Sequence, residues 1–173
     1  MILTGKEIAR QVEEGRIIIE PFDASTVTTN SYDIHLSDTV LVYEDEILDP
    51  KVKPKTKEIK IPEEGMILNQ HDFVLGASHE RVGSNFFAPM LHAKSGTARQ
   101  GLFVHVTSDL VNIGSIGQLT LQLYATLPVK IYPGMRIAQV TFWVPEGEIE
   151  LYEGKYQNAK GPGFSKNYEE FND

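Results

Sequence analysis

Helical periodicity disappears from this sequence after about residue 15, and this restricts the fold more than any other feature. Beyond that point, short runs of Val, Ile, Leu, Tyr and Phe alternate with glycine, proline and charged residues. These runs predict strands at residues 16–20, 32–36, 40–43, 57–61, 73–77, 102–106, 117–125, 129–131 and 137–144. Many short strands joined by tight turns favour an all-β sandwich or barrel over a doubly wound α/β domain.

One short helix is predicted at the N-terminus, over residues 5–14. Thr4 and Glu7 have the spacing of a capping box, in which their side chains accept hydrogen bonds from free backbone N–H groups. Apolar residues follow at helical intervals. Gly15 is a natural stop, because glycine tolerates the left-handed conformation that ends many helices. We interpret this helix as a packing element.

The length of 173 residues is typical of one domain, which we assign to residues 1–173. Residues 154–173 are polar and contain Gly161-Pro162-Gly163, which predicts a mobile C-terminal tail. The sequence has no internal repeat and no glycine-rich phosphate loop of the P-loop or Rossmann kind.

The composition excludes several classes of function. A net charge of −8 argues against a binder of duplex nucleic acid, which needs a basic face. The absence of cysteine excludes a thiol nucleophile and the cysteine-ligated zinc that zinc-type nucleobase deaminases require. No N-terminal run has the basic, apolar and small-residue order of a signal peptide, and the longest apolar runs are far shorter than the ~18 residues of a membrane span. We therefore expect a cytoplasmic protein without a membrane partner.

Residues 92–102 hold the groups with the most distinctive chemistry. Lys94 and Arg99 supply two cations, with Ser95 and Gly96 between them. Small residues let backbone N–H groups approach an anion closely, while lysine and arginine neutralise its charge. This segment is therefore a candidate anion site.

The segment and its surroundings resemble the dCTP deaminase and trimeric dUTPase superfamily, whose central block carries Arg-Ser-Ser-x-x-Arg-x-Gly-Leu. Here that block reads Lys94-Ser95-Gly96-Thr97-Ala98-Arg99-Gln100-Gly101-Leu102. Residues 30–36 are similar to the family's early strand with an aspartate, and residues 133–142 to its late Pro-Gly-x-x-Ile-x-Gln strand. The resemblance covers nearly the whole chain, and it is closer to the deaminases than to the dUTPases.

This resemblance implies a distorted, dUTPase-like β-barrel of the jelly-roll type, assembled as a homotrimer with nucleotide sites at the subunit boundaries. The ligand would be dCTP or dUTP. Mg²⁺ would be held mostly by the triphosphate oxygens, with no metal ligand from the protein and no zinc. The residues that the resemblance places around the nucleotide are Lys94, Ser95, Gly96, Arg99, Thr107, Asn112, Gln122, Tyr152 and Lys155.

Within that set, Ser95 and Arg99 would bind phosphates. Lys94 stands where the family has its first arginine, and lysine supplies the charge without the fork geometry that grips two oxygens at once. Gly96 stands where the family has its second serine, so only a backbone N–H is left there as a donor.

Two further departures affect the groups that carry the family's catalysis. In the deaminases a glutamate activates water for attack on C4 of cytosine, and Gln122 occupies its position here. The family's aspartate falls on Asn112. An amide does not titrate near neutrality and cannot act as a general base. Ala159 also replaces a tail residue that is usually glutamine.

Asp109 and His105 are the candidates for a replacement base. Asp109 lies three residues before Asn112, and histidine titrates near pH ~6.5. The alternating apolar residues around His105 favour a hydrogen-bonded core histidine, and Asp109 is more typical of a turn residue.

Three functions remain open on the sequence alone. The chain could hydrolyse the amino group of dCTP to give dUTP, using unfamiliar catalytic residues. It could be a dUTP diphosphatase of the same fold. It could also be a catalytically silent nucleotide-binding or regulatory homologue, which the amides at positions 112 and 122 favour.

Overall fold

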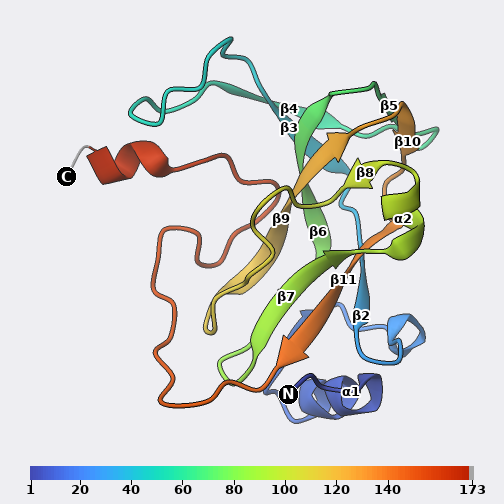
Figure 1. The fold of residues 1–173 in the computed structure, drawn as a ribbon, viewed down its shortest axis with the longest axis vertical. Helices are drawn as coiled ribbons and strands as arrows, with labels where there is room; N and C mark the ends of the chain where they lie inside the picture. Colours follow the sequence, from blue (N-terminus) through green and yellow to red (C-terminus); the bar gives the residue numbers. More distant parts are fainter. Residues whose placement is uncertain (172–173) are drawn as a thin grey trace.

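A computed structural model describes residues 1–171. The chain forms three antiparallel β-sheets with short helices at their margins (Figure 1). The strands are β1 (Ile18–Glu20), β2 (Tyr32–His35), β3 (Thr39–Tyr43), β4 (Thr56–Lys60), β5 (Met66–Leu68), β6 (Phe73–Gly83), β7 (Ala88–Ala93), β8 (Leu102–Phe103), β9 (Ile116–Ala125), β10 (Val129–Ile131) and β11 (Arg136–Trp143). The helices are α1 (Gly5–Glu13), α2 (Ser95–Arg99) and the 3₁₀ turns η1 (Ala24–Thr26) and η2 (Asn167–Phe171). The chain is therefore mostly β, as predicted.

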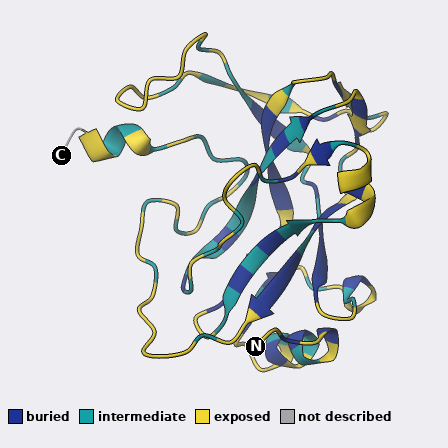
Figure 2. Cartoon of the chain, in the orientation of Figure 1, coloured by how far each residue is buried: buried dark blue, intermediate teal, exposed yellow. Residues whose placement is uncertain are grey.

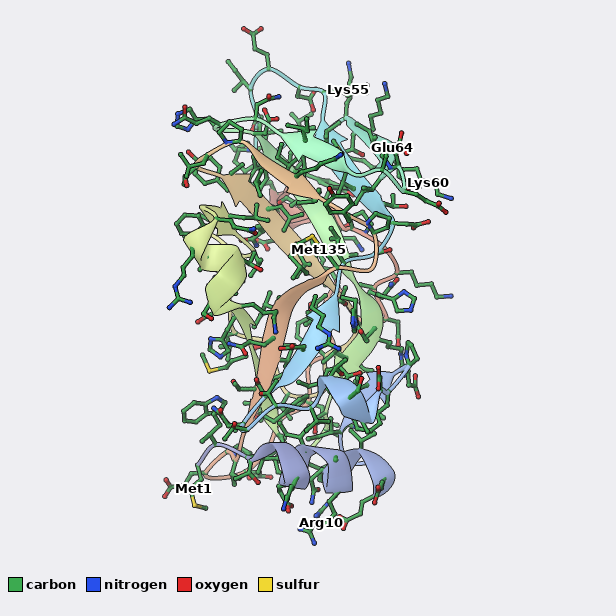
Figure 3. The ribbon with its side chains drawn as sticks, turned by 90° about the vertical axis from the view of Figure 1, so that its right-hand side faces the viewer. Met1, Arg10, Lys55, Lys60, Glu64 and Met135 are labelled. Carbon is green, nitrogen blue, oxygen red and sulfur yellow. The ribbon has the colours of Figure 1, made fainter. Side chains whose placement is uncertain are left out.

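The largest sheet has the order β4-β3-β6-β9-β8, with β1 also paired to β6. A second sheet has the order β2-β11-β7, and β5 pairs with β10 in a third. The three sheets are not joined into one closed barrel. The molecule is elongated, with α1 and Arg10 at one end and Lys55, Lys60 and Glu64 at the other (Figure 3).

The core lies between the large sheet and the β2-β11-β7 sheet (Figure 2). Tyr32 and Ile34 of β2, Phe142 of β11 and Leu121 and Leu123 of β9 are fully buried there. In the second half of β9, buried residues alternate with partly exposed ones, so one face of this strand packs in the core and the other faces outward.

Some local expectations were wrong in detail. Thr4 is the N-cap of α1, but its side chain makes no capping hydrogen bond, and Glu7 instead binds Arg10 and Gln11. The capping box is therefore not formed. The strand predicted at residues 102–106 ends at Phe103. Two strands, β5 and β7, were not predicted, and neither were α2, η1 and η2. No helix within residues 1–171 is long and apolar enough to cross a membrane.

The C-terminal segment leaves β11, loops outward and returns to β9 (Figure 1). Backbone hydrogen bonds join Asn158 N–H to the Ile116 carbonyl and Gln118 N–H to the Ala159 carbonyl. The tail that we expected to be mobile thus has specific bonds to the sheet over part of its length. Its last two residues, Asn172 and Asp173, lie outside the described residues.

Gly117 allows the tail to lie this close to β9. A Cβ built on Gly117 would lie 2.7 Å from the Ala159 backbone nitrogen, whereas one built on Gly96 would meet nothing within 4 Å. We expect Gly117→Ala to displace the tail and to speed tryptic cleavage after Lys155 and Lys160, measured by mass spectrometry. Gly96→Ala is the matched control and should leave cleavage unchanged. Equal cleavage rates in both variants would contradict this packing.

Candidate functional site

The site is a pocket of about 830 Å³ between the outward face of β9, the loop after β8 and the C-terminal tail. Gln118, Thr120, Gln122 and Tyr124 reach it from β9, because every second residue of a strand points to the same face. Tyr152, Tyr156, Gly163 and Phe164 close it from the tail, and Thr107 and Asn112 belong to the loop. The pocket lining also includes Tyr43 of β3, Phe73 and Leu75 of β6 and Leu91 of β7, so the pocket is built from segments that are far apart in the sequence.

The described side chains that line this pocket are uncharged. Among the described residues around it there is no Asp, Glu, His, Lys or Arg, and its polar groups are amides, hydroxyls and backbone atoms. Such a pocket suits an uncharged, flat, polar molecule, and it offers no counter-charge for a polyphosphate.

Gln122 lines the pocket, and a hydrogen bond fixes the orientation of its side-chain amide. Its side-chain Oε1 accepts a hydrogen bond from the Val106 backbone N–H at 3.0 Å. The backbone N–H of Gln122 donates to the Val104 carbonyl at 2.9 Å. The amide of Asn112 is exposed and makes no hydrogen bond with the described residues. These two positions lie where the family resemblance expects carboxylates.

The four predicted residues that meet at this pocket are Thr107, Asn112, Gln122 and Tyr152. Lys94, Ser95, Gly96 and Arg99 do not line it. They form α2 and its N-cap, on the side of β9 away from the tail in Figure 1. Within one chain, Ser95 and Arg99, which the resemblance assigns to phosphate binding, are therefore separate from the four residues that line the pocket.

Lys155 is also outside the pocket lining. Its Nζ donates to the Glu170 carboxylate at 2.5 Å and to the Lys166 carbonyl at 3.1 Å. The hydrogen bond to Glu170 raises the pKa of Lys155 above its usual value. In this arrangement Lys155 fastens the end of the tail.

Lys94 has a structural partner that the sequence did not indicate. Its Nζ forms an ion pair with Oδ2 of Asp33, whose side chain is only 4% exposed. The other carboxylate oxygen of Asp33 is buried without a hydrogen-bond partner among the described residues. Lys94 therefore neutralises a buried carboxylate, while Ser95 and Arg99 remain exposed.

Neither candidate replacement base faces the pocket. Asp109 pairs through its backbone with β7, where its carbonyl accepts the Leu91 N–H at 2.8 Å. His105 was expected to be a hydrogen-bonded core histidine, but its Nδ1 is buried without a partner among the described residues. The chain bends after Phe103, so the alternation that suggested a strand through His105 does not hold.

Sequence reasoning missed the aromatic lining of the site, above all Tyr124 and Tyr156. A signal was present for Tyr124, because it continues the period of two from Gln118 through Thr120 and Gln122 on the outward face of β9. Tyr156 comes from the tail, and local sequence does not show which surface a tail covers.

Comparison with known proteins gives a consistent picture. A family model described as dCTP deaminase-like matches residues 2–144. The chain is 44% identical over 172 residues to a dCTP deaminase, dUMP-forming, from Clostridium beijerinckii, covering 99% of each chain. A protein of the same name from Cytophaga hutchinsonii is 39% identical over 172 residues, covering 99% of each. This chain belongs to the dCTP deaminase-like family.

A solved dCTP deaminase from Agrobacterium tumefaciens has the same fold, with a TM-score of 0.65 and 19% identity. The match covers 83% of this chain and 48% of that one. The names of the curated relatives give dUMP as the product, where our sequence interpretation had named dUTP.

The Lys94–Asp33 pair leads to a stability prediction. Removing one partner of a buried ion pair leaves an uncompensated charge, so we expect Lys94→Met to lower the free energy of unfolding by about 3 kcal/mol. Adding Asp33→Asn should recover most of that loss, because the orphaned charge is then gone. Urea denaturation followed by circular dichroism measures both. A fully stable Lys94→Met variant would show that the pair contributes nothing.

Proposed function

We propose that this protein binds a deoxypyrimidine nucleoside triphosphate and has lost rapid hydrolytic turnover. The observation that carries the proposal is the absence of any side chain that ionises near neutral pH among the described residues lining the pocket. Hydrolytic deamination needs a base to activate water for attack on C4, and a positioned base contributes about 10²–10⁴-fold in rate. Gln122 and Asn112 preserve the shape of the site without supplying that base.

The separation of α2 from the pocket supports a homotrimer. An uncharged pocket accepts the base and sugar, while the triphosphate needs cations that this chain presents elsewhere. We propose that α2 of a neighbouring subunit supplies Ser95 and Arg99 to each site. Arg99 is exposed at the end of α2 and makes no ion pair with the described residues, so its guanidinium is available to phosphate oxygens.

Within the described residues, no group of three or more His, Asp or Glu side chains could hold a metal ion. The protein's own donors therefore do not fit a protein-held metal centre. We propose that Mg²⁺ arrives with the nucleotide, coordinated by phosphate oxygens, which this hard cation prefers.

A second candidate is an active dCTP deaminase that forms dUMP, favoured by the 39–44% identity to proteins of that name. That conversion consumes two waters and releases ammonia and pyrophosphate, so it needs water activated at C4 and at the α-phosphate. A dUTP diphosphatase would perform the second step alone. Both reactions need the base that the pocket lacks.

Restoring the carboxylates tests the proposal directly. We expect the wild type to release ammonia and pyrophosphate from dCTP and Mg²⁺ slowly or not at all. Gln122→Glu combined with Asn112→Asp should raise that rate by about 10² or more, because it returns the missing base. Gln70→Glu, an exposed change outside the pocket, is the matched charge control. Wild-type turnover near ~10 s⁻¹ would overturn the proposal.

Substitution of Arg99 tests whether two subunits share each nucleotide site. We expect Arg99→Met to weaken triphosphate binding about tenfold or more while leaving nucleoside binding unchanged, because a charge-assisted hydrogen bond to phosphate is lost. Isothermal titration with the nucleoside and its triphosphate separates the two effects. Light scattering should report a trimer at micromolar concentration. A monomer would contradict the shared site.

A further inference from the structure

The orientation of the Gln122 amide follows from its partner. The backbone N–H of Val106 can only donate, so the atom 3.0 Å away must be the amide oxygen of Gln122. The NH₂ group then points away from Val106. It makes no hydrogen bond with the described residues, and it is not among their buried atoms that lack a partner, so it is accessible in the pocket that Gln122 lines.

The other glutamine on this face of β9, Gln118, has hydrogen-bond partners for both groups of its side-chain amide. Gln118 donates through Nε2 to the Ser78 carbonyl at 2.7 Å, and its Oε1 accepts the Gly161 N–H at 2.7 Å. Asn112 is exposed, and no side-chain hydrogen bond to residues 1–171 fixes its amide, so it can turn either way toward a ligand. Gln122 is therefore the amide on β9 that presents a fixed donor to the pocket.

We infer that Gln122 makes this pocket select pyrimidines with a carbonyl at position 4, the uracil type, over cytosine. The inference rests on the proposed function, with Gln122 facing position 4 of the base. The 4-carbonyl of uracil or thymine accepts a hydrogen bond, whereas the 4-amino group of cytosine donates one. Against cytosine, two donors face each other and neither finds an acceptor, which weakens binding.

A rotated amide does not remove this preference. Turning the Gln122 side chain by half a rotation would offer the oxygen to cytosine, but it would place the NH₂ group against the Val106 N–H. The hydrogen bond gained with cytosine would be offset by the loss of the hydrogen bond from Val106, so the rotation would bring no net gain in binding. A carboxylate at position 122 behaves differently, because one oxygen can accept from Val106 while the other accepts from the amino group of cytosine.

The experiment compares α,β-imido-dUTP with α,β-imido-dCTP by isothermal titration in Mg²⁺. These analogues resist cleavage between the α- and β-phosphates, and ligand recovered after each titration is checked by chromatography for deamination. We expect the wild type to bind the uracil analogue about tenfold or more tightly than the cytosine analogue, which corresponds to one hydrogen bond gained or lost.

Two variants assign the preference to the side chain. Gln122→Glu should invert it, and Gln122→Met, which is similar in shape but has no amide, should remove it. The bases also differ at N3, and the methionine variant isolates the part of the discrimination that passes through Gln122. Gln70→Glu should behave like the wild type.

The outcomes separate this inference from the proposed function. If neither analogue binds at millimolar concentration, the proposed function fails. If both bind equally, or if the cytosine analogue binds more tightly to the wild type, nucleotide binding stands and the selectivity is wrong. A uracil preference that persists in Gln122→Met would show that another residue sets it.

Discussion

The register between β6 and β9 is the constraint on which the site depends. Eight residue pairs align the two strands, among them Leu75 with Gln122. This register sends Leu121 and Leu123 of β9 into the core, and it turns Gln122 and Tyr124 toward the pocket. A slip by one residue would reverse both faces, burying an amide and exposing leucines. Packing of the core therefore fixes which side chains reach a ligand.

Hydrophobic patterning was sufficient to predict the strands with strong alternation or apolar runs, such as β9 and β11. It was insufficient for β7, whose sequence contains Pro89 and Met90 and has no clear period. Six residue pairs with β11 hold β7 in place, and those contacts are remote in sequence. The α2 helix was missed because five residues that include Ser95 and Gly96 have little helical propensity of their own.

Some residues of the site could likewise be predicted from the sequence, and others could not. The family resemblance grouped Thr107, Asn112, Gln122 and Tyr152, and these four residues line one pocket. The role of Lys94 could not be predicted, because Asp33 lies 61 residues away along the chain. Asp33 on β2 and the end of β7 flank the same strand, β11, so a long lysine side chain spans the gap between them. That juxtaposition exists only after folding.

The uncharged pocket lies apart from α2 and its N-cap, which carry Arg99 and Lys94, and this separation has a chemical consequence. Affinity for a triphosphate comes mainly from its charges, whereas recognition of the base comes from neutral hydrogen bonds and flat apolar contacts. In this chain the two sets of groups lie on different elements, α2 and β9. Under the proposed function, exchanging a carboxylate for an amide on β9 would leave the phosphate contacts of α2 in place. It would change both the chemistry available at the nucleobase and the hydrogen-bond pattern that the nucleobase must match. The proposed function thus couples turnover and base preference through one side chain, and it assigns phosphate affinity to α2.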